Sequence, residues 1–312
     1  MGQARTTPRT AAFALFAGLS IGIPGACFAQ VSGGGSSGDR YANYPTTLTL
    51  AGVVRDFKER SVTGGHPDFE LNPAGGFAQY LGEVQDTLDA DGKPVFRSSG
   101  YKLLSDWKDS QGRNIMNPRT YISARSGDVA GSMATTTGGA LTSAERLGQW
   151  FRDVSGVNSS KQLSVTLARQ ANSNLYSFND RTDALYSARG GFFPINGELF
   201  GNSANETKNF HFTFELNTEF VYEQGTGQTF TFTGDDDVWV FVDGKLVIDI
   251  GGIHSAKSQT IEIDRLNWLQ NGQTYSFKFF FAERHRTQSN CRIDTTMRLR
   301  SIDPPATTAL FD

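Results

Sequence analysis

The stretch GDDDVWVFVDGKLVID (234–249) is the most informative segment of this 312-residue chain. Residues 238–242 alternate valine with large aromatic side chains, and an apolar run resumes at residue 246. Between them stands Asp243-Gly244, and an Asp-Gly pair between two such runs predicts a tight β-hairpin, because both central residues of the turn need positive φ. Asp243 is therefore expected to be a turn residue, and the acidic triplet 235–237 is expected to lie where the hairpin begins.

Three neighbouring carboxylates at 235–237 need an explanation, because like charges held close together repel one another. A hard cation would relieve that repulsion, and Ca²⁺ is the one that oxygen ligands commonly hold in extracellular proteins. We therefore expect Asp235, Asp236 and Asp237 to contribute to a calcium site. The alternative is an acidic turn that is simply hydrated.

The N-terminal residues read as an export signal. Arg5 and Arg9 precede an apolar run over 11–23, and small residues lead to a predicted cleavage site after Ala29. Acylation of Cys27 is the alternative. We expect residues 1–29 to be a signal peptide, 30–44 a Gly/Ser-rich linker and 304–312 a tail, so that the protein is secreted, at the cell surface or in a periplasm.

The amino-acid composition limits the kinds of partner that we expect for this protein. The formal charge of −3 becomes −5 once the signal and its two arginines are removed. Without a basic stripe to neutralise phosphates, nucleic acid is not an expected partner. Cys291 would be the remaining cysteine, either a buried thiol or half of an intermolecular bridge. The 24 phenylalanines supply ample apolar material for a core.

Short alternating runs separated by turns predict an all-β protein, an antiparallel β-sandwich with long loops and one or two short helices. Residues 142–154 form the clearest helical candidate, with Ser143 as a plausible N-cap. The expected strands cover 48–57, 162–168, 174–178, 210–216, 228–233, 238–242, 245–249, 258–263, 274–282 and 292–300.

Several phrases along the chain resemble the fibro-slime domain family, over about residues 48–302, and imply one such domain over 45–303. They are HPDFE (66–70), DADGKPVF (89–96), QWFRDVSGVN (149–158), FFPING (192–197), NFHFTFEL (209–216), FTGDDDVWVFVDGKLVIDIGGIH (232–254) and FFAERHRTQSNCRIDT (280–295).

The second half, about 190–303, is also similar to the protective-antigen-type lectin domain called PA-fourteen, a jelly-roll sandwich that flocculins carry. In those lectins two consecutive aspartates joined by a cis peptide bond hold Ca²⁺, and sugar hydroxyls complete its coordination. The resemblance implies that role for Asp235 and Asp236. Asp237 stands where the family usually has glycine.

The same resemblance implies a second loop, here residues 285–290. Asn290 is the preferred further metal ligand in that loop. Gln288 and Ser289 offer neutral oxygens of the kind Ca²⁺ accepts. His285 lies beside them and is expected to touch a ligand.

These observations predict an exported, non-catalytic, calcium-dependent module that binds glycans or cell-surface polysaccharide. A structural surface or matrix protein, in which Ca²⁺ only stabilises the fold, is the principal alternative. A glycoside hydrolase is a weaker one, because adjacent aspartates cannot flank a glycosidic bond at the required separation of about 5–10 Å.

Overall fold

The computed structural model describes residue 2 and residues 39–302. The predicted signal peptide, most of the predicted linker and the predicted tail lie outside these residues. The described part is almost entirely antiparallel β-structure, which confirms the predicted fold class. Within the described part, no helix is long and apolar enough to cross a membrane.

All ten predicted strands are present with shifted ends, and β2–β6 and α2 are additional elements. The strands are β1 (Thr47–Phe57), β2 (Tyr80–Leu81), β3 (Tyr101–Ser105), β4 (Trp107–Lys108), β5 (Asn114–Ile115), β6 (Ser132–Thr137), β7 (Asn158–Arg169), β8 (Tyr176–Asn179), β9 (Phe212–Val221), β10 (Thr229–Gly234), β11 (Asp237–Val242), β12 (Lys245–Ile250), β13 (Lys257–Glu262), β14 (Thr274–Glu283), β15 (Cys291–Thr295) and β16 (Arg300–Ser301). The helices are α1 (Ala144–Leu147), α2 (Ala184–Arg189) and the 3₁₀ turn η1 (Ile263–Arg265).

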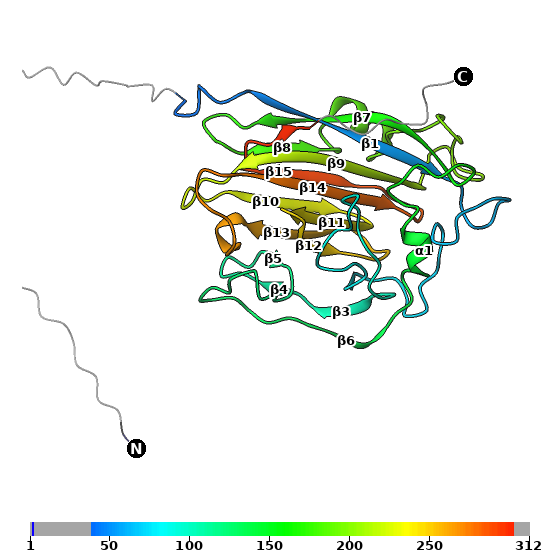
Figure 1. Ribbon diagram of the computed structural model, residues 1–312, viewed down its shortest axis with the longest axis horizontal. Helices are drawn as coiled ribbons and strands as arrows, with labels where there is room; N and C mark the ends of the chain where they lie inside the picture. The colour runs from blue at the N-terminus through cyan, green and yellow to red at the C-terminus, as the bar shows by residue number, and fades with distance from the viewer. Residues whose placement is uncertain (1, 3–38, 303–312) are drawn as a thin grey trace, which may run out of the picture. The chain divides into compact units, whose positions relative to one another are not determined.

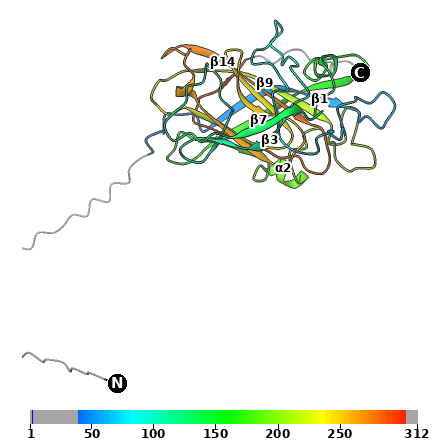
Figure 2. The same cartoon turned by 90° about the horizontal axis from the view of Figure 1, so that it is seen from below.

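In the described chain, eleven strands form one continuous sheet in the order β12-β11-β14-β9-β1-β7-β8-β15-β10-β13, with β16 beside β9 (Figure 1). β7 pairs with β1 along its length and reaches β8 only at residues 168–169. From there the sheet continues as a second layer that faces the first (Figure 2). β1, β7 and β8 precede residue 190, so the sandwich takes strands from both halves of the chain.

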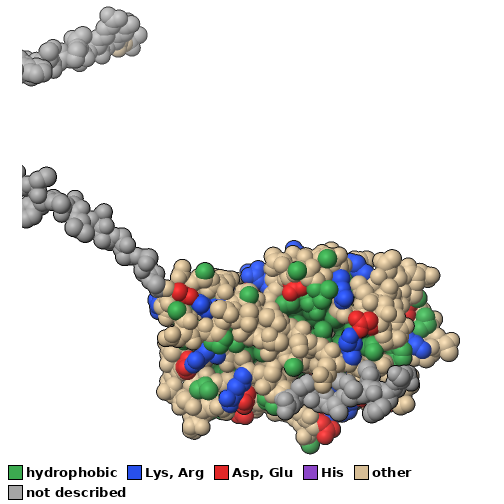
Figure 3. Space-filling model, turned by 90° about the horizontal axis from the view of Figure 1, so that it is seen from above, with side chains coloured by type: hydrophobic (Ala, Val, Ile, Leu, Met, Phe, Trp, Pro, Cys, Tyr) green, Lys and Arg blue, Asp and Glu red, His purple; other side chains and the backbone are tan. Residues whose placement is uncertain are grey.

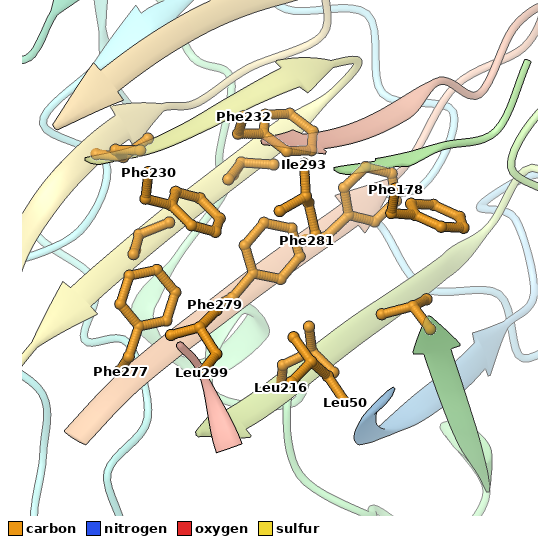
Figure 4. Packing of buried hydrophobic residues seen from close by; sticks show 14 of the residues in the cluster. Leu50, Phe178, Leu216, Phe230, Phe232, Phe277, Phe279, Phe281, Ile293 and Leu299 are labelled. Carbon is orange, nitrogen blue, oxygen red and sulfur yellow. The ribbon is translucent and has the colours of Figure 1, made fainter. Parts of the chain in front are cut away.

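Aromatic side chains fill the space between the two layers (Figure 4). Phe277 and Phe279 of β14 face Phe230 and Phe232 of β10, with ring centroids 4.7 Å apart for Phe230–Phe277 and 5.6 Å apart for Phe232–Phe279. Alternation along each strand puts these side chains on one face. The predicted phenylalanine core is therefore the interior of the sandwich.

The opposite face of β11 and β14 is also buried. Trp239, Phe241 and Phe280 contact residues of the N-terminal half, and the indole rings of Trp150 and Trp239 lie 6.0 Å apart. Val238, Val240 and Val242 point to the inner core. The segment between β1 and β7 thus acts as a cover for the outer face of the first layer, which makes β11 apolar on both faces.

The predicted helix over 142–154 is shorter than expected. α1 spans only Ala144–Leu147, although Ser143 accepts the N–H of Arg146 as the predicted N-cap. Trp150 and Phe151 follow in turns and are fully buried in the outer core. Their packing ends the helix, because burial of two large rings outweighs the weak propensity of a short helix.

The hairpin turn provides a test of the local prediction. Val242 pairs with Lys245, and Asp243 and Gly244 have φ values of 50° and 75°. A Cβ on Gly244 would meet no atom within 4 Å, so Gly244→Ala introduces backbone strain alone. We expect the free energy of unfolding to fall by about 1 kcal/mol in urea denaturation. Asp243→Asn is the control, since asparagine tolerates positive φ; an equal loss in the control would contradict this explanation.

Candidate functional site

Asp235 and Asp236 link β10 to β11 at one end of the sandwich, and Asp237 is the first residue of β11. β10 ends at Gly234 and β11 begins at Asp237. The backbone of the second loop passes so close that a Cβ on Gly234 would lie 2.1 Å from the carbonyl oxygen of Asn290. Glycine at this position therefore lets the two loops meet. The predicted pairing of the acidic loop with the 285–290 loop is present in the structure.

Asp237 does not face the site, which corrects its predicted role as a metal ligand. Its carboxylate accepts hydrogen bonds from Nε and Nη2 of Arg284, at 2.5 and 3.1 Å. It also accepts a hydrogen bond from the N–H of Gly252 at 2.6 Å. Both Asp237 and Arg284 are fully buried. Two carboxylate oxygens already satisfied by a guanidinium and a backbone amide leave Asp237 as the counter-ion of Arg284.

Asp236 lies at the floor of an open hollow and is held by the backbone. Its Oδ1 and Oδ2 each accept one N–H, from His254 and from Arg284, both at 3.1 Å. Burial and then the neighbouring Asp237 raise the pKa of Asp236 to about 8. Each oxygen still has a second lone pair, so the carboxylate can accept a further ligand.

Asp235 contacts the second loop directly. Nδ2 of Asn290 donates to Oδ1 and Oδ2 of Asp235 at 3.0 and 2.7 Å, and Oδ1 of Asn290 accepts from Arg181 at 3.2 Å. The amide nitrogen of Asn290, rather than its oxygen, therefore faces Asp235. Burial raises the pKa of Asp235 to about 6.

Glu283, at the end of β14, adds a third carboxylate. It is fully buried, and among the described residues neither of its oxygens has a hydrogen-bond partner. Burial and then the negative charges of Asp236 and Asp235 raise the pKa of Glu283 well above its usual value. A buried carboxylate without a partner is costly in its charged form, so burial favours the neutral acid at Glu283.

An open hollow of about 380 Å³, here called the first hollow, is lined by Asp235 and Asp236 but not by Glu283. Phe77 is 55% exposed at its rim, with its ring centroid 4.9 Å from that of His285. Burial lowers the pKa of His254 to about 4, and its Nε2 has no partner among the described residues. The lining residues are Phe77, Asp235, Asp236, Ile253, His254, Ser255, His285, Arg286, Thr287 and Gln288.

The other predicted residues of the second loop have different positions. His285 and Gln288 line the first hollow, and Nε2 of His285 lies 3.3 Å from Glu70. Ser289 is buried, and its hydroxyl donates to the carbonyl of Phe192 at 2.8 Å, so it is not free for a ligand. The Asp235–Asp236 bond is trans; the described residues have their cis peptide bond between Arg286 and Thr287, which corrects the implied position.

Sequence reasoning did not single out Phe77, His254 or Glu283 as site residues. Glu283 had a local signal, since it ends an apolar strand immediately before the second loop. Phe77 had none: it belongs to a Gly-rich loop, and only the fold places it beside residues more than 150 positions later.

Comparison with known proteins identifies the domain that carries the candidate site. Residues 194–312 match the PA14 domain model. The chain therefore contains a PA14 domain. The PA14 domain supplies both the acidic loop and the second loop, and it is a module of the carbohydrate-binding or adhesion type, typically extracellular.

Relatives of this chain match residues of its N-terminal half as well. Protein psiR of Dictyostelium discoideum is 31% identical over 81% of this chain, and protein psiD of the same organism is 43% identical over 47% of it. The chain spans only 22% and 28% of those two relatives' own lengths.

Solved structures give weak superpositions. The PA14 domain of the MpAFP antifreeze protein is 8% identical, with a TM-score of 0.23 over 78% of this chain and 80% of that one. A β-glucosidase from Kluyveromyces marxianus is 12% identical, with a TM-score of 0.21 over 27% of this chain and 11% of that one. Scores this low carry no argument about the site.

Proposed function

We propose that this PA14 protein is an exported, non-catalytic module that binds glycans or cell-surface polysaccharide with the help of Ca²⁺. Asp235 and Asp236 would hold the cation at the floor of the first hollow. When bound, the cation would supply coordination positions for sugar hydroxyls.

The observation that carries this proposal is negative charge without a counter-charge. Asp235 and Asp236 line the first hollow, Glu283 is buried near them without lining it, and burial raises the pKa of all three. The nearest buried cation, Arg284, is engaged by Asp237. A hard divalent cation fits such a site, because carboxylate oxygens are the ligands that it prefers.

The coordination sphere would need neutral oxygens as well. Within residues 39–302, no three acidic, histidine or cysteine side chains converge closely enough to complete a metal site. Ca²⁺ accepts amide and carbonyl oxygens and waters to reach six to eight ligands. Asn290 is the nearest amide, but its oxygen accepts from Arg181 and its nitrogen donates to Asp235, so the amide would have to exchange these hydrogen bonds to become a ligand.

The first hollow also has the features of a sugar site. It is open, it has polar groups at its floor, and the half-exposed ring of Phe77 stands at its rim. An aromatic face can cover the apolar side of a sugar ring, while the floor groups orient its hydroxyls.

One face of the molecule favours a neutral partner over nucleic acid. On the face drawn in Figure 3, basic and acidic side chains lie next to one another and form no extended patch of one sign. Many are paired, as Arg152 is with Asp89 and Asp91. Phosphate backbones need clustered positive charge.

A glycan array tests the proposal. We expect the mature chain to bind in millimolar Ca²⁺ and to lose binding in EDTA. Phe77→Ala is expected to weaken binding by about fivefold to tenfold, from lost contact of the ring with the sugar, while leaving the melting temperature unchanged.

Two controls make the array decisive. Phe200→Ala removes another half-exposed aromatic ring, which lies outside the first hollow, and is expected to bind like wild type. Binding that persists in EDTA would exclude a calcium-dependent mechanism. No binding with Ca²⁺ present would favour the structural-matrix alternative.

A further inference from the structure

A second hollow, of about 360 Å³, lies beside the first. Thr287 and Gln288 line both, so the second loop forms a ridge between them. The far wall comes from the β8–α2 region, which precedes the PA14 match. The lining residues are Asp180, Arg181, Ser187, Gly190, Gly191, Thr287, Gln288, Ser289 and Asn290.

The second hollow contains a buried acceptor that the fold does not use fully. Asp180 is 2% exposed; its Oδ1 accepts the N–H of Cys291 at 3.1 Å. Its Oδ2 has no hydrogen-bond partner among the described residues. Burial raises the pKa of Asp180. Buried polar atoms are nearly always satisfied, so Asp180 places an incompletely compensated carboxylate directly behind the wall of the hollow.

Arg181 supplies the complementary donor. It is exposed, and its Nη2 donates to Oδ1 of Asn290 at 3.2 Å, which leaves other N–H groups of the guanidinium free to bind. Asn290 in turn donates to Asp235 of the first hollow. The polar groups of the two hollows are thus joined through one amide.

The backbone shapes this hollow closely. Gly190 ends α2 in the left-handed conformation, and a Cβ on Gly191 would lie 2.6 Å from the carbonyl oxygen of Ser289. The N–H of Phe192 donates to that same oxygen at 2.8 Å. α2 is therefore held against the second loop, and the wall is preformed.

We propose that the second hollow is a subsite for an adjoining sugar residue, so that the protein selects neutral oligosaccharides over single sugars. This inference rests on the proposed function of the first hollow. Arg181 donates to a sugar hydroxyl, and the buried carboxylate of Asp180 places negative charge behind the wall. The volume of each hollow lies at the small end of the range for ligand sites, about 300–1,000 Å³. One oligosaccharide that crosses the ridge would therefore fill both hollows.

The pairing of charges selects a neutral ligand. A carboxylated sugar would bring negative charge against Asp180, which is already buried without a compensating partner on one oxygen. A hydroxyl can accept from the guanidinium of Arg181 without bringing negative charge toward that carboxylate. The class of ligand is therefore an uncharged oligosaccharide of at least two residues.

Calorimetry with a length series tests the subsite. The probe is a set of neutral homo-oligosaccharides of one to six residues, built from the sugar that gives the strongest array signal in Ca²⁺. We expect the mature wild-type chain to bind the longer members at least about tenfold more tightly than the monosaccharide, as one or two added charge-assisted hydrogen bonds provide.

Two variants test whether the gain in affinity for longer oligosaccharides comes from the second hollow. Arg181→Ala removes the donor, and Ser187→Trp places a bulky ring from the exposed face of α2 into the hollow. Both are expected to bring the oligosaccharide affinity close to that of the monosaccharide, with the monosaccharide affinity unchanged. Ser187→Ala is the matched control and should behave as wild type. Melting temperatures verify that each variant is folded.

The outcomes separate the two proposals. Equal affinity of wild type for short and long members overturns the subsite and leaves the first hollow intact. An equal loss of monosaccharide and oligosaccharide binding in Arg181→Ala also overturns it, because Arg181 would then act through Asn290 on the first hollow. Absence of binding to every member by wild type in Ca²⁺ overturns both proposals.

Discussion

Arg284→Met is expected to lower the free energy of unfolding by about 3–5 kcal/mol, the cost of leaving a buried partner charge unpaired. Arg284 is fully buried and binds Asp237 through two nitrogens. Its Nη1 also donates to the carbonyls of Asp68 and Ala140, at 3.3 and 3.0 Å. The guanidinium therefore ties β14 to β11 and to the covering segment, and urea denaturation measures the loss.

A surface arginine provides the control. Arg292 pairs with Asp294 but its side chain is 48% exposed, so Arg292→Met should change stability by less than about 1 kcal/mol. The double variant Arg284→Met with Asp237→Leu should be less destabilised than Arg284→Met alone, because it removes both charges. A loss below about 1 kcal/mol for Arg284→Met would contradict this assignment and would make Asp237 a candidate cation ligand again.

Ca²⁺ at 10 mM is expected to stabilise the mature chain by about 1.4–2.7 kcal/mol, if the dissociation constant lies in the extracellular range of about 10⁻⁴–10⁻³ M. Replacing both Asp235 and Asp236 with asparagine should abolish that gain. The physical reason is mass action: a cation that binds only the folded state shifts the unfolding equilibrium. Thermal melts with Ca²⁺ and with EDTA measure it.

The calcium effect should grow with pH. Burial raises the pKa of Asp235 to about 6 and of Asp236 to about 8, above the ordinary value of 3.8. In the metal-free protein the stability that these protons contribute is present below about pH 4 and is lost as pH rises through about 8. At pH 5 the cation must displace protons, and at pH 8 it displaces few, so the shift in melting temperature should be larger at pH 8.

The matched control is Asp243→Asn, which removes an exposed carboxylate from the turn of the same hairpin. It should keep the full calcium effect. A shift that survives in the Asp235/Asp236 variant would place the cation elsewhere. No shift at either pH would remove calcium from the mechanism and leave the first hollow as a metal-free site.

Much of the fold follows from local patterns. The alternation over 238–242, with Asp243-Gly244 behind it, predicts β11, its turn and β12 without reference to any other part of the chain. Most of the other predicted strands are also present, with ends displaced by a few residues. The predicted helix was too long, because its last two aromatic residues are held by the outer core.

The site was predictable in part. Adjacent aspartates before a hairpin point to the correct loop, and the resemblance points to its partner loop. The role of each carboxylate was not predictable, because it depends on which donor reaches it. Asp237 and Asp236 are neighbours in sequence, yet the side chain of Arg284 pairs with one and its backbone N–H with the other.

By itself, the sequence determined the strand pattern, the hairpin and the presence of an acidic loop at one end of a β-sandwich, since these depend on residues close together in the chain. The tertiary structure alone decided which carboxylates face a hollow, that Phe77 stands at its rim, and that Asp180 and Arg181 line a neighbouring one. Those positions result from contacts between distant segments, and periodicity within one segment carries no information about them.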